Sequence, residues 1–234
     1  MERTLIITGA SSGIGRAVAL ALAGWDGLLL LSGRSGERLG ETLAALEAAG
    51  GHGAVQVCDL RESGDIETLI KTAEARAPLH GLVHCGGAAE FAPADEQPPE
   101  TWAAQIELNL VAAYHLTHHA LKIMLPRQRG HIIYINSVAG RQPFPASSAY
   151  VAAKHGLRGL ADAVREEGRP KGIKVTTIYP GATDTPWWNH QPGKAPAERM
   201  LSADHVAQTV AFALSLSGPA VVEELVVRHV RGDF

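Results

Sequence analysis

The chain has 234 residues, a length that fits one large domain and allows a sizeable buried core. Hydrophobic residues make up 46% of it and charged residues 19%, which is ordinary for a soluble globular protein. The net charge of −3 provides no basic surface for nucleic acid or an anionic membrane, so we expect neither as a partner.

Short apolar runs alternate with amphipathic segments along the whole chain. Most runs are continuously apolar, which is typical of strands covered on both faces. The predicted strands are Thr4–Thr8, Leu28–Ser32, Ala54–Val57, Gly81–Cys85, His131–Asn136, Lys174–Tyr179 and Glu223–Val230. The predicted helices are Ile14–Ala23, Glu37–Ala49, Asp65–Arg76, Asn109–Met124, Ala149–Glu167 and Ala203–Leu216. This alternation predicts a single doubly wound α/β domain over residues 1–234, a Rossmann-type fold with a seven-stranded parallel sheet and helices on both faces.

Two stretches interrupt this alternation. Glu90–Glu100 and Thr183–Met200 are rich in proline and polar residues, and each follows an apolar strand. Ligands of open parallel sheets bind at the carboxyl ends of the strands, where a long loop is more often functional than incidental. We therefore expect a loop in the first stretch and a substrate lid at about residues 183–201.

A glycine-rich turn joins the first strand to the first helix. The sequence TGASSGIG places glycines at positions 9, 13 and 15. Glycine permits a tight turn and lets backbone amides approach a pyrophosphate at the helix N-terminus. Because the motif lies between a strand and a helix, we favour a dinucleotide site over a glycine-rich turn without a ligand.

Four more motifs follow along the chain. Asn109 lies in IELNLVAAYHLT, Ser137 in IIYINSVAG, and Tyr150 precedes Lys154 by one helical turn in SSAYVAAKHGL. Pro180-Gly181 is followed by Thr185. Together with the glycine turn, these motifs resemble in type and order those of the short-chain dehydrogenase/reductase family, over essentially the whole chain. Each motif is weak alone, but five in the right order are specific.

The resemblance implies an enzyme that acts on a CH–OH group with NAD(P) as acceptor, and Asn109, Ser137, Tyr150 and Lys154 as its catalytic residues. Tyr150 would exchange a proton with the substrate oxygen, to which Ser137 would hydrogen-bond. Lys154 would bind the nicotinamide ribose, and Asn109 would hold a water that connects Lys154 to solvent. A positive charge ~5 Å from the phenolate, at an effective dielectric of ~20, is worth ~3 kcal/mol, so we expect Lys154 to lower the pKa of Tyr150 by about two units.

The end of the second strand, LLLLSGRS, bears on the choice of cofactor. Gly33 occupies the position of the acidic residue that an NAD enzyme needs, and Arg34 follows it. A guanidinium at Arg34, aided by the Ser35 hydroxyl, suits a 2′-phosphate, so we expect NADP(H), with NAD(H) as the alternative. Asp59 and Leu60 would line the adenine pocket. The expected cofactor-binding residues are Gly9, Ser11, Ser12, Gly13, Ile14, Gly15, Arg34, Ser35, Asp59, Leu60, Gly86, Gly87, Tyr150, Lys154, Pro180, Gly181, Thr183 and Thr185.

The chain departs from the family pattern in two places. Where the family usually has Asn-Asn-Ala-Gly, this chain has His84-Cys85-Gly86-Gly87, and Cys85 can replace the asparagine that steadies the central strands only with weak hydrogen bonds. The C-terminus lacks the Asp-Gly-Gly segment that many tetrameric members carry. We expect a homodimer through the helices Asn109–Met124 and Ala149–Glu167, and a tetramer stays open.

The substrate is the least constrained part of the interpretation. Trp187 and Trp188, in a polar loop, are predicted to cover a pocket. The other expected lining residues are Ser137, Ala139, Arg141, Tyr150 and Ala182. This mostly apolar lining favours small aldehydes, ketones or secondary alcohols, whereas Arg141, unless it is a solvated loop residue, would suit hydroxy or keto acids.

Other classes of protein remain as alternatives. They are an NAD-dependent alcohol or hydroxy-acid dehydrogenase and a non-catalytic NADP(H)-binding regulatory protein, although a regulator needs no complete proton path.

His115, His118 and His119 share a helix face without a metal-binding pattern, and Cys58 and Cys85 lack metal-ligand spacing, so we expect no metal. Without a visible secretory signal or membrane span, we expect a cytoplasmic protein.

Overall fold

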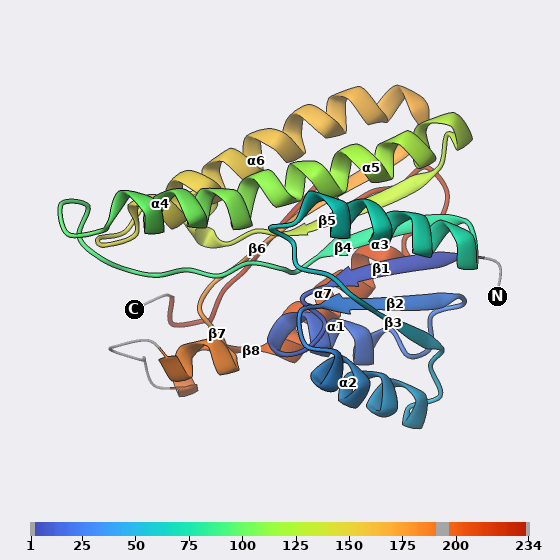
Figure 1. Ribbon diagram of the computed structural model, residues 1–234, viewed down its shortest axis with the longest axis horizontal. Coiled ribbons are helices and arrows are strands. Elements are labelled where there is room, and N and C mark those ends of the chain that lie inside the picture. Colours follow the sequence, from blue (N-terminus) through green and yellow to red (C-terminus); the bar gives the residue numbers. More distant parts are fainter. Residues whose placement is uncertain (1–2, 191–196, 233–234) are drawn as a thin grey trace.

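The computed structural model describes residues 3–190 and 197–232. At its centre lies a parallel sheet with the strand order β3-β2-β1-β4-β5-β6-β9 (Figure 1). The strands are β1 (Thr4–Thr8), β2 (Leu28–Gly33), β3 (Gly53–Val57), β4 (Leu79–His84), β5 (Gly130–Ile135), β6 (Ile173–Pro180) and β9 (Glu224–Val227). The predicted doubly wound fold with a seven-stranded parallel sheet is confirmed.

Helices cover both faces of the sheet (Figure 1). On one face lie α1 (Gly13–Ala21), α2 (Gly36–Ala48) and α7 (Ala203–Ser215). On the other lie α3 (Ser63–Arg76), α5 (Ala112–Arg127) and α6 (Ser148–Gly168). Successive β1 side chains enter the two different cores, Ile6 on one face and Leu5 and Ile7 on the other, which explains why the strand is continuously apolar.

The stretch predicted as a loop at Glu90–Glu100 ends in a helix. Helix α4 (Pro99–Ile106) begins within it, with Pro99 in the first turn, where a missing N–H does no harm. A π-helical turn, η1 (Glu107–Val111), joins α4 to α5. The helix predicted to begin at Asn109 therefore continues a longer helical segment, and Asn109 lies in the π turn, a type of irregularity that is frequent at functional sites.

Two short strands pair where the segment predicted as a lid begins and ends. Strands β7 (Thr183–Asp184) and β8 (Leu201–Ser202) pair in parallel as a small second sheet. The Leu201 N–H also donates a hydrogen bond to the Ala182 carbonyl at 2.8 Å. Two 3₁₀ turns, η4 (Pro186–His190) and η5 (Ala197–Arg199), lie between these strands, and positions 191–196 of the predicted lid lie outside the described residues.

Within residues 3–190 and 197–232, no helix is both long enough and apolar enough to cross a membrane.

Candidate active site

The turn between β1 and α1 is held in shape by its own backbone. Gly9 and Gly13 have φ angles of 65° and 52°, a region that side-chain-bearing residues rarely adopt. A Cβ on Gly15 would lie 2.3 Å from the Gly9 carbonyl oxygen. Ser12 is the N-cap of α1, and in the described structure its side chain makes no capping hydrogen bond. The helix N-terminus therefore presents N–H groups in an arrangement that suits a phosphate.

Thr8 and His84 join the ends of β1 and β4. The Thr8 hydroxyl oxygen accepts hydrogen bonds from the Cys85 and Gly86 N–H groups, both at 3.2 Å, and lies 2.9 Å from His84 Nδ1. Because this oxygen already accepts two bonds, its own proton points to Nδ1, and the neutral imidazole carries its proton on Nε2. Burial, helped by the charge of Lys154, lowers the pKa of His84 to about 3. The bond that steadies the central strands thus comes from Thr8 and His84, and not from the Cys85 side chain considered from the sequence.

Tyr150 and Lys154 lie one turn apart on α6, at the carboxyl end of β5. Lys154 Nζ lies 5.5 Å from the centre of the Tyr150 ring and donates a hydrogen bond to the Ile135 carbonyl at 3.2 Å. The Asn136 amide donates to the Lys154 carbonyl at 3.1 Å, which holds α6 against the end of β5. The Ser137 hydroxyl lies near enough to the Tyr150 phenol to lower the pKa of that phenol. Three of the four predicted catalytic side chains therefore meet in one place.

Burial shifts both titrating groups toward their neutral forms. It raises the pKa of Tyr150, although the nearby Ser137 hydroxyl opposes the shift, and it lowers the pKa of Lys154 to about 8. The direction for Tyr150 is the opposite of the one expected from the sequence. That expectation counted the attraction of the Lys154 charge but omitted desolvation, which penalises the phenolate and the ammonium alike.

Asn109 brings a buried acceptor to the same place. Its Nδ2 donates to the carbonyls of Ala88 (2.7 Å) and Gln105 (2.9 Å), while its Oδ1 is buried without a partner among the described residues. A Cβ on Gly87 would lie 2.7 Å from this oxygen and 3.8 Å from Lys154 Nζ, so the two atoms flank the same glycine. A buried amide oxygen left unpaired destabilises a fold, so it calls for a water or ligand partner.

The end of β2 carries the residues expected at the adenine ribose. Arg34 is exposed, and a Cβ on Gly33 would lie 3.4 Å from Ser11 Oγ in the glycine turn. Ser35 Oγ accepts a hydrogen bond from the Arg38 N–H and so caps α2. The sequence reasoning placed Ser35 beside the phosphate, and its hydroxyl proton remains for that purpose.

The region predicted to bind adenine also holds a cation that the sequence reasoning missed. Arg61 Nε donates to Asp59 Oδ1 at 3.0 Å. This bond, with a smaller contribution from the Arg34 charge, lowers the pKa of Asp59 to about 2. Leu60 packs against Gly86, where a Cβ would lie 2.3 Å from Leu60 Cδ1. Two guanidinium groups thus flank one carboxylate beside the end of β2.

The segment after β6 reaches back to the glycine turn. The Gly181 N–H donates to the Val227 carbonyl at 2.8 Å, and the Thr183 hydroxyl donates to the Gly181 carbonyl at 3.0 Å. Thr185 lies against the turn, since a Cβ on Gly13 would be 3.2 Å from Thr185 Cγ2. Residues that are far apart in the sequence therefore meet at the glycine turn.

The residues around Tyr150 differ in part from the predicted pocket lining. Ala139 is fully buried and contributes no surface. Arg141 forms an ion pair with Glu224 at 2.8 Å, and its guanidinium lies 5.2 Å from the centre of the Tyr179 ring. Trp187 is joined by two rings that the sequence reasoning missed, Phe91 and Phe144. Phe91 follows β4 in a proline-rich loop, and an aromatic residue in such a loop was the only signal.

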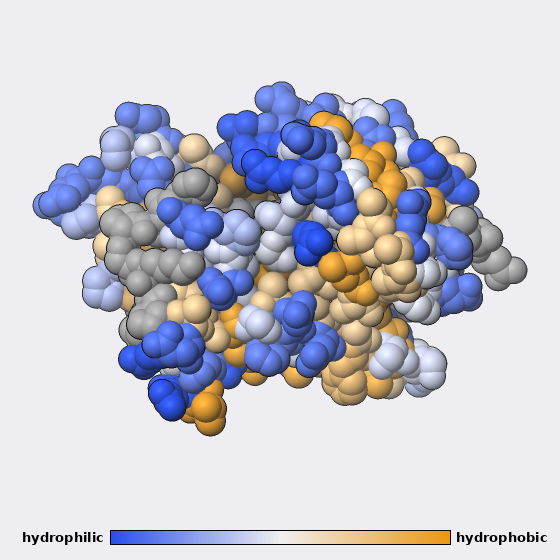
Figure 2. Space-filling model, turned by 90° about the horizontal axis from the view of Figure 1, so that it is seen from below, coloured by the Kyte–Doolittle hydropathy of each residue, from blue (hydrophilic) through white to orange (hydrophobic). Residues whose placement is uncertain are grey.

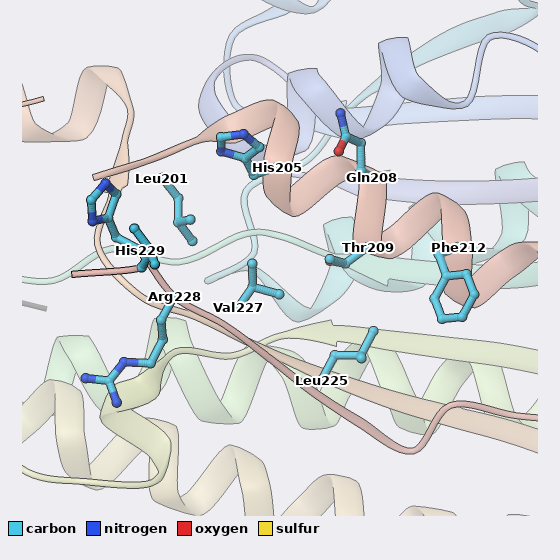
Figure 3. Close-up of a pocket in the computed structure, with 10 residues that line it drawn as sticks. Leu201, His205, Gln208, Thr209, Phe212, Leu225, Val227, Arg228 and His229 are labelled. Carbon is cyan, nitrogen blue, oxygen red and sulfur yellow. The ribbon is translucent and has the colours of Figure 1, made fainter. Parts of the chain in front are cut away.

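Apolar surface also occurs away from this site. The face seen from the side of α1 and α2 carries a band of apolar side chains (Figure 2). A groove of about 580 Å³ lies between α7 and β9, and Figure 3 shows its lining. None of the four predicted catalytic residues belongs to that lining. Exposed apolar surface alone therefore does not identify the site.

No metal centre is formed by the described part of the chain, where no group of three or more His, Cys, Asp or Glu side chains is arranged to hold an ion. His118 and His119 instead contact each other as rings, with centres 5.2 Å apart.

Comparison with known proteins gives a consistent family. The sequence profile described as short chain dehydrogenase matches residues 3–195. The chain is 35% identical over 187 residues to a protein named 3beta-hydroxysteroid dehydrogenase from Mediterraneibacter gnavus, with 79% of this chain and 67% of the relative covered. It is 31% identical over 241 residues to one named sepiapterin reductase from Chlorobaculum tepidum, with 100% and 98% covered.

Solved structures are similar along nearly the whole chain. A variant of actinorhodin polyketide ketoreductase with NADPH has a TM-score of 0.91 at 28% identity, covering 100% of this chain and 98% of that one. An alcohol dehydrogenase from Thermococcus sibiricus complexed with 5-hydroxy-NADP has a TM-score of 0.90 at 29% identity, with 98% and 97% covered.

Proposed function

The chain belongs to the short-chain dehydrogenase family, and from that premise we propose that it is an NADP(H)-dependent oxidoreductase for small carbonyl compounds or secondary alcohols. The observation that carries the proposal is the meeting of Ser137, Tyr150 and Lys154 at the end of β5. The glycine turn fits a dinucleotide, because its positive φ angles and the close packing of Gly15 on the Gly9 backbone make a tight turn that ends at the N-terminus of α1, where a phosphate is favoured.

Tyr150 is the proton donor and acceptor in this proposal. Nicotinamide, when bound, supplies or accepts the hydride. A carbonyl that is being reduced gains negative charge on oxygen and needs a proton at that moment. The raised pKa keeps the Tyr150 phenol protonated at neutral pH, and Ser137 orients the phenol and the substrate oxygen through its hydroxyl.

Lys154 and Asn109 serve proton resupply and cofactor positioning. With a pKa of about 8, Lys154 can gain and lose a proton near neutral pH. Its ammonium group is a donor for a ribose hydroxyl. The unpaired Asn109 oxygen lies beside the same glycine and is an acceptor for a water between Lys154 and solvent.

Preference for the phosphorylated cofactor is supported by charge at the end of β2. Gly33 leaves no carboxylate to repel a 2′-phosphate, and Arg34 is exposed there. Arg61 adds a second cation, although Asp59 balances it. Two solved relatives whose names include NADPH and 5-hydroxy-NADP agree with this preference.

Neutral carbonyl substrates are favoured over acids. Arg141, the one cation considered for a substrate carboxylate, is paired with Glu224. The Phe91 ring lies 6.1 Å from the Tyr150 ring and 5.6 Å from the Trp187 ring, so apolar surface adjoins the proposed proton donor. Apolar rings next to a few polar groups at the reacting atom suit a neutral substrate with an apolar body.

Replacing Tyr150 with phenylalanine tests the proposal directly. Tyr150→Phe keeps the ring but removes the proton, so kcat for ketone reduction should fall ~100-fold or more while NADPH still binds. Tyr114→Phe is the matched control, since Tyr114 is half exposed on α5. Full activity of Tyr150→Phe would refute the proton-donor role. If the unmodified protein bound the cofactor but turned over no carbonyl or alcohol, that result would favour a regulatory protein.

The cofactor preference has its own test. Arg34→Ala should lower kcat/KM for NADPH by roughly 10- to 150-fold and leave that for NADH unchanged, because a charge-assisted bond to the phosphate is worth about 1.5–3 kcal/mol. Arg38→Ala, on the exposed surface of α2, is the control. Equal or better use of NADH by the unmodified protein would contradict the preference.

A further inference from the structure

Phe91 lies at the centre of an aromatic cluster beside Tyr150. Its ring centre is 6.1 Å from that of Tyr150, 5.6 Å from Phe144 and 5.6 Å from Trp187. The interplanar angles are 81°, 74° and 86°, so all three contacts are edge-to-face. The four rings come from different parts of the chain, namely the loop after β4, the loop before α6, α6 itself and η4.

The backbone on both sides of Phe91 is anchored. The Glu90 N–H donates to Gln105 Oε1 at 3.0 Å, and the Glu90 carbonyl accepts from Gln105 Nε2 at 3.1 Å. The Ala92 N–H donates to the Ala146 carbonyl at 2.9 Å. Phe91 is thus held between two fixed neighbours, although it lies in a loop without regular secondary structure.

The anchor is shared with the candidate catalytic residues. Gln105 lies one helical turn before Asn109, is buried, and accepts a hydrogen bond from the Asn109 amide on its own carbonyl. Gln105 therefore holds both residues: its side chain fixes the backbone beside Phe91, and its carbonyl holds the Asn109 side chain. Gln105 thus fixes the position of the aromatic cluster relative to the candidate catalytic residues.

The rings of this cluster are not fully covered. Phe91 and Trp187 are half-buried, and Phe144 is 41% exposed. Aromatic side chains usually bury most of their large apolar surface, so rings left open beside a proton donor provide surface for a ligand to cover. A planar aromatic ring can extend these edge-to-face contacts, whereas a puckered saturated ring has no aromatic edge or face to offer.

We propose that Phe91 is a specificity-determining residue that selects substrates with a planar aromatic ring next to the carbonyl carbon. This inference rests on the proposed function and names a substrate class for the same site. Pairs of aromatic rings contribute about 0.5–1.5 kcal/mol beyond the area they bury, which corresponds to a preference of roughly 2- to 12-fold over a saturated ring of similar size.

The test compares two ketones of similar size, acetophenone and cyclohexyl methyl ketone, with NADPH. Because their carbonyls differ in intrinsic reactivity, the decisive quantity is the change in the ratio of their kcat/KM values on mutation. Phe91→Leu should lower the ratio of acetophenone to cyclohexyl methyl ketone by about fivefold, through KM for acetophenone. Phe212→Leu is the control, since Phe212 is exposed in the groove between α7 and β9, and it should leave the ratio unchanged.

Two outcomes would overturn the inference. A ratio that stays constant in Phe91→Leu, with both ketones losing equally, would make Phe91 a structural residue that only packs against the lid. A ratio that changes as much in Phe212→Leu would show a general effect of losing a phenylalanine. Thermal midpoints of all three proteins establish that each variant is folded.

A binding measurement separates this inference from the proposed function. The alcohols 1-phenylethanol and 1-cyclohexylethanol are titrated calorimetrically, with NADP⁺ present, into the unmodified protein and Phe91→Leu. Tighter binding of the phenyl compound that is lost in Phe91→Leu supports the inference even if neither ketone is reduced, a result that would contradict the proposed function alone. Equal binding of both alcohols overturns the inference, while turnover of either ketone would leave the proposed function intact.

Discussion

The cofactor side and the substrate side of the candidate site are held by different interactions. On the cofactor side, backbone groups contact one another: Gly9 has a positive φ, Gly15 lies directly against the Gly9 carbonyl, and Thr8 binds two N–H groups after β4. On the substrate side, the rings of Phe91 and Trp187 meet edge-to-face from segments far apart in the sequence.

The two sides should respond differently to mutation. A turn that depends on missing side chains loses its shape with almost any substitution, because the colliding atoms belong to the backbone and cannot move aside. An aromatic wall can exchange one ring for another side chain while the backbone below it stays in place. The cofactor side should therefore fail abruptly on mutation, and the substrate side should change its selectivity first.

The largest effect is expected at Gly15. In Gly15→Ala the new Cβ would lie 2.3 Å from the Gly9 oxygen, so the turn must open. NADPH affinity should fall about 100-fold or more, and the free energy of unfolding should fall by roughly 1–3 kcal/mol, as in other overpacked sites. Fluorescence titration with NADPH and thermal unfolding measure the two quantities.

Gly40→Ala is the matched control for this change. Gly40 lies within α2, and apart from the adjoining backbone of the helix itself no described atom lies within 4 Å of the position its Cβ would take. The free energy of unfolding of this variant should rise by about 0.5–1 kcal/mol, because alanine is the better helix former. Its affinity for NADPH should stay normal. Normal NADPH binding by Gly15→Ala would remove the distinction between the two sides.

The next effect concerns the charge of Lys154, which lies between the two sides. Its pKa in the folded protein, about 8, is below the ordinary value of 10.5, so the unfolded chain binds more protons and stability rises with pH between these values. Burial of the ammonium thus destabilises the fold at pH 7. Lys154→Met should increase the free energy of unfolding by about 2 kcal/mol at pH 7 while abolishing turnover, after allowance for the lost bond to the Ile135 carbonyl.

The pH dependence makes this prediction specific. The gain should shrink as the pH rises from about 8 to 10.5, where the unmodified lysine loses its charge. Denaturant unfolding at several pH values measures it, with Lys71→Met, a change on the exposed side of α3, as the control. A loss of stability at pH 7, or a gain that does not depend on pH, would contradict the role assigned to burial.

The smallest effect is expected at Arg141. Its pair with Glu224 is partly exposed, and such pairs contribute about 0–1 kcal/mol. Arg141→Ala should therefore change kcat/KM by less than about threefold, equally for matched neutral and acidic carbonyls. Arg158→Ala is the control, because Arg158 approaches the same carboxylate at 3.7 Å. A selective loss of activity on acids would restore the hydroxy-acid alternative.

The sequence predicted correctly the features that depend on residues close together in the chain. The apolar runs became strands, which are covered on both faces in the centre of the sheet and partly exposed in the edge strands β3 and β9, and the glycine turn has the positive φ angles that its spacing indicates. Helix α4 was missed because Pro98 and Pro99 were interpreted as part of a loop, although proline is compatible with the first turn of a helix. The direction of the Tyr150 pKa shift was missed because a sequence pattern contains the neighbouring charge but not the burial.

The sequence by itself therefore determined the order of the main strands along the chain, the glycine turn and the helical spacing of Tyr150 and Lys154. Each of these depends on a backbone requirement or a periodicity that spans a few residues. Only the tertiary structure decided that Phe91 lies beside Tyr150, that Thr185 contacts Gly13, and that Arg141 is paired with Glu224. Such contacts join segments that are distant along the chain, and their geometry follows from how the helices and loops pack on the sheet.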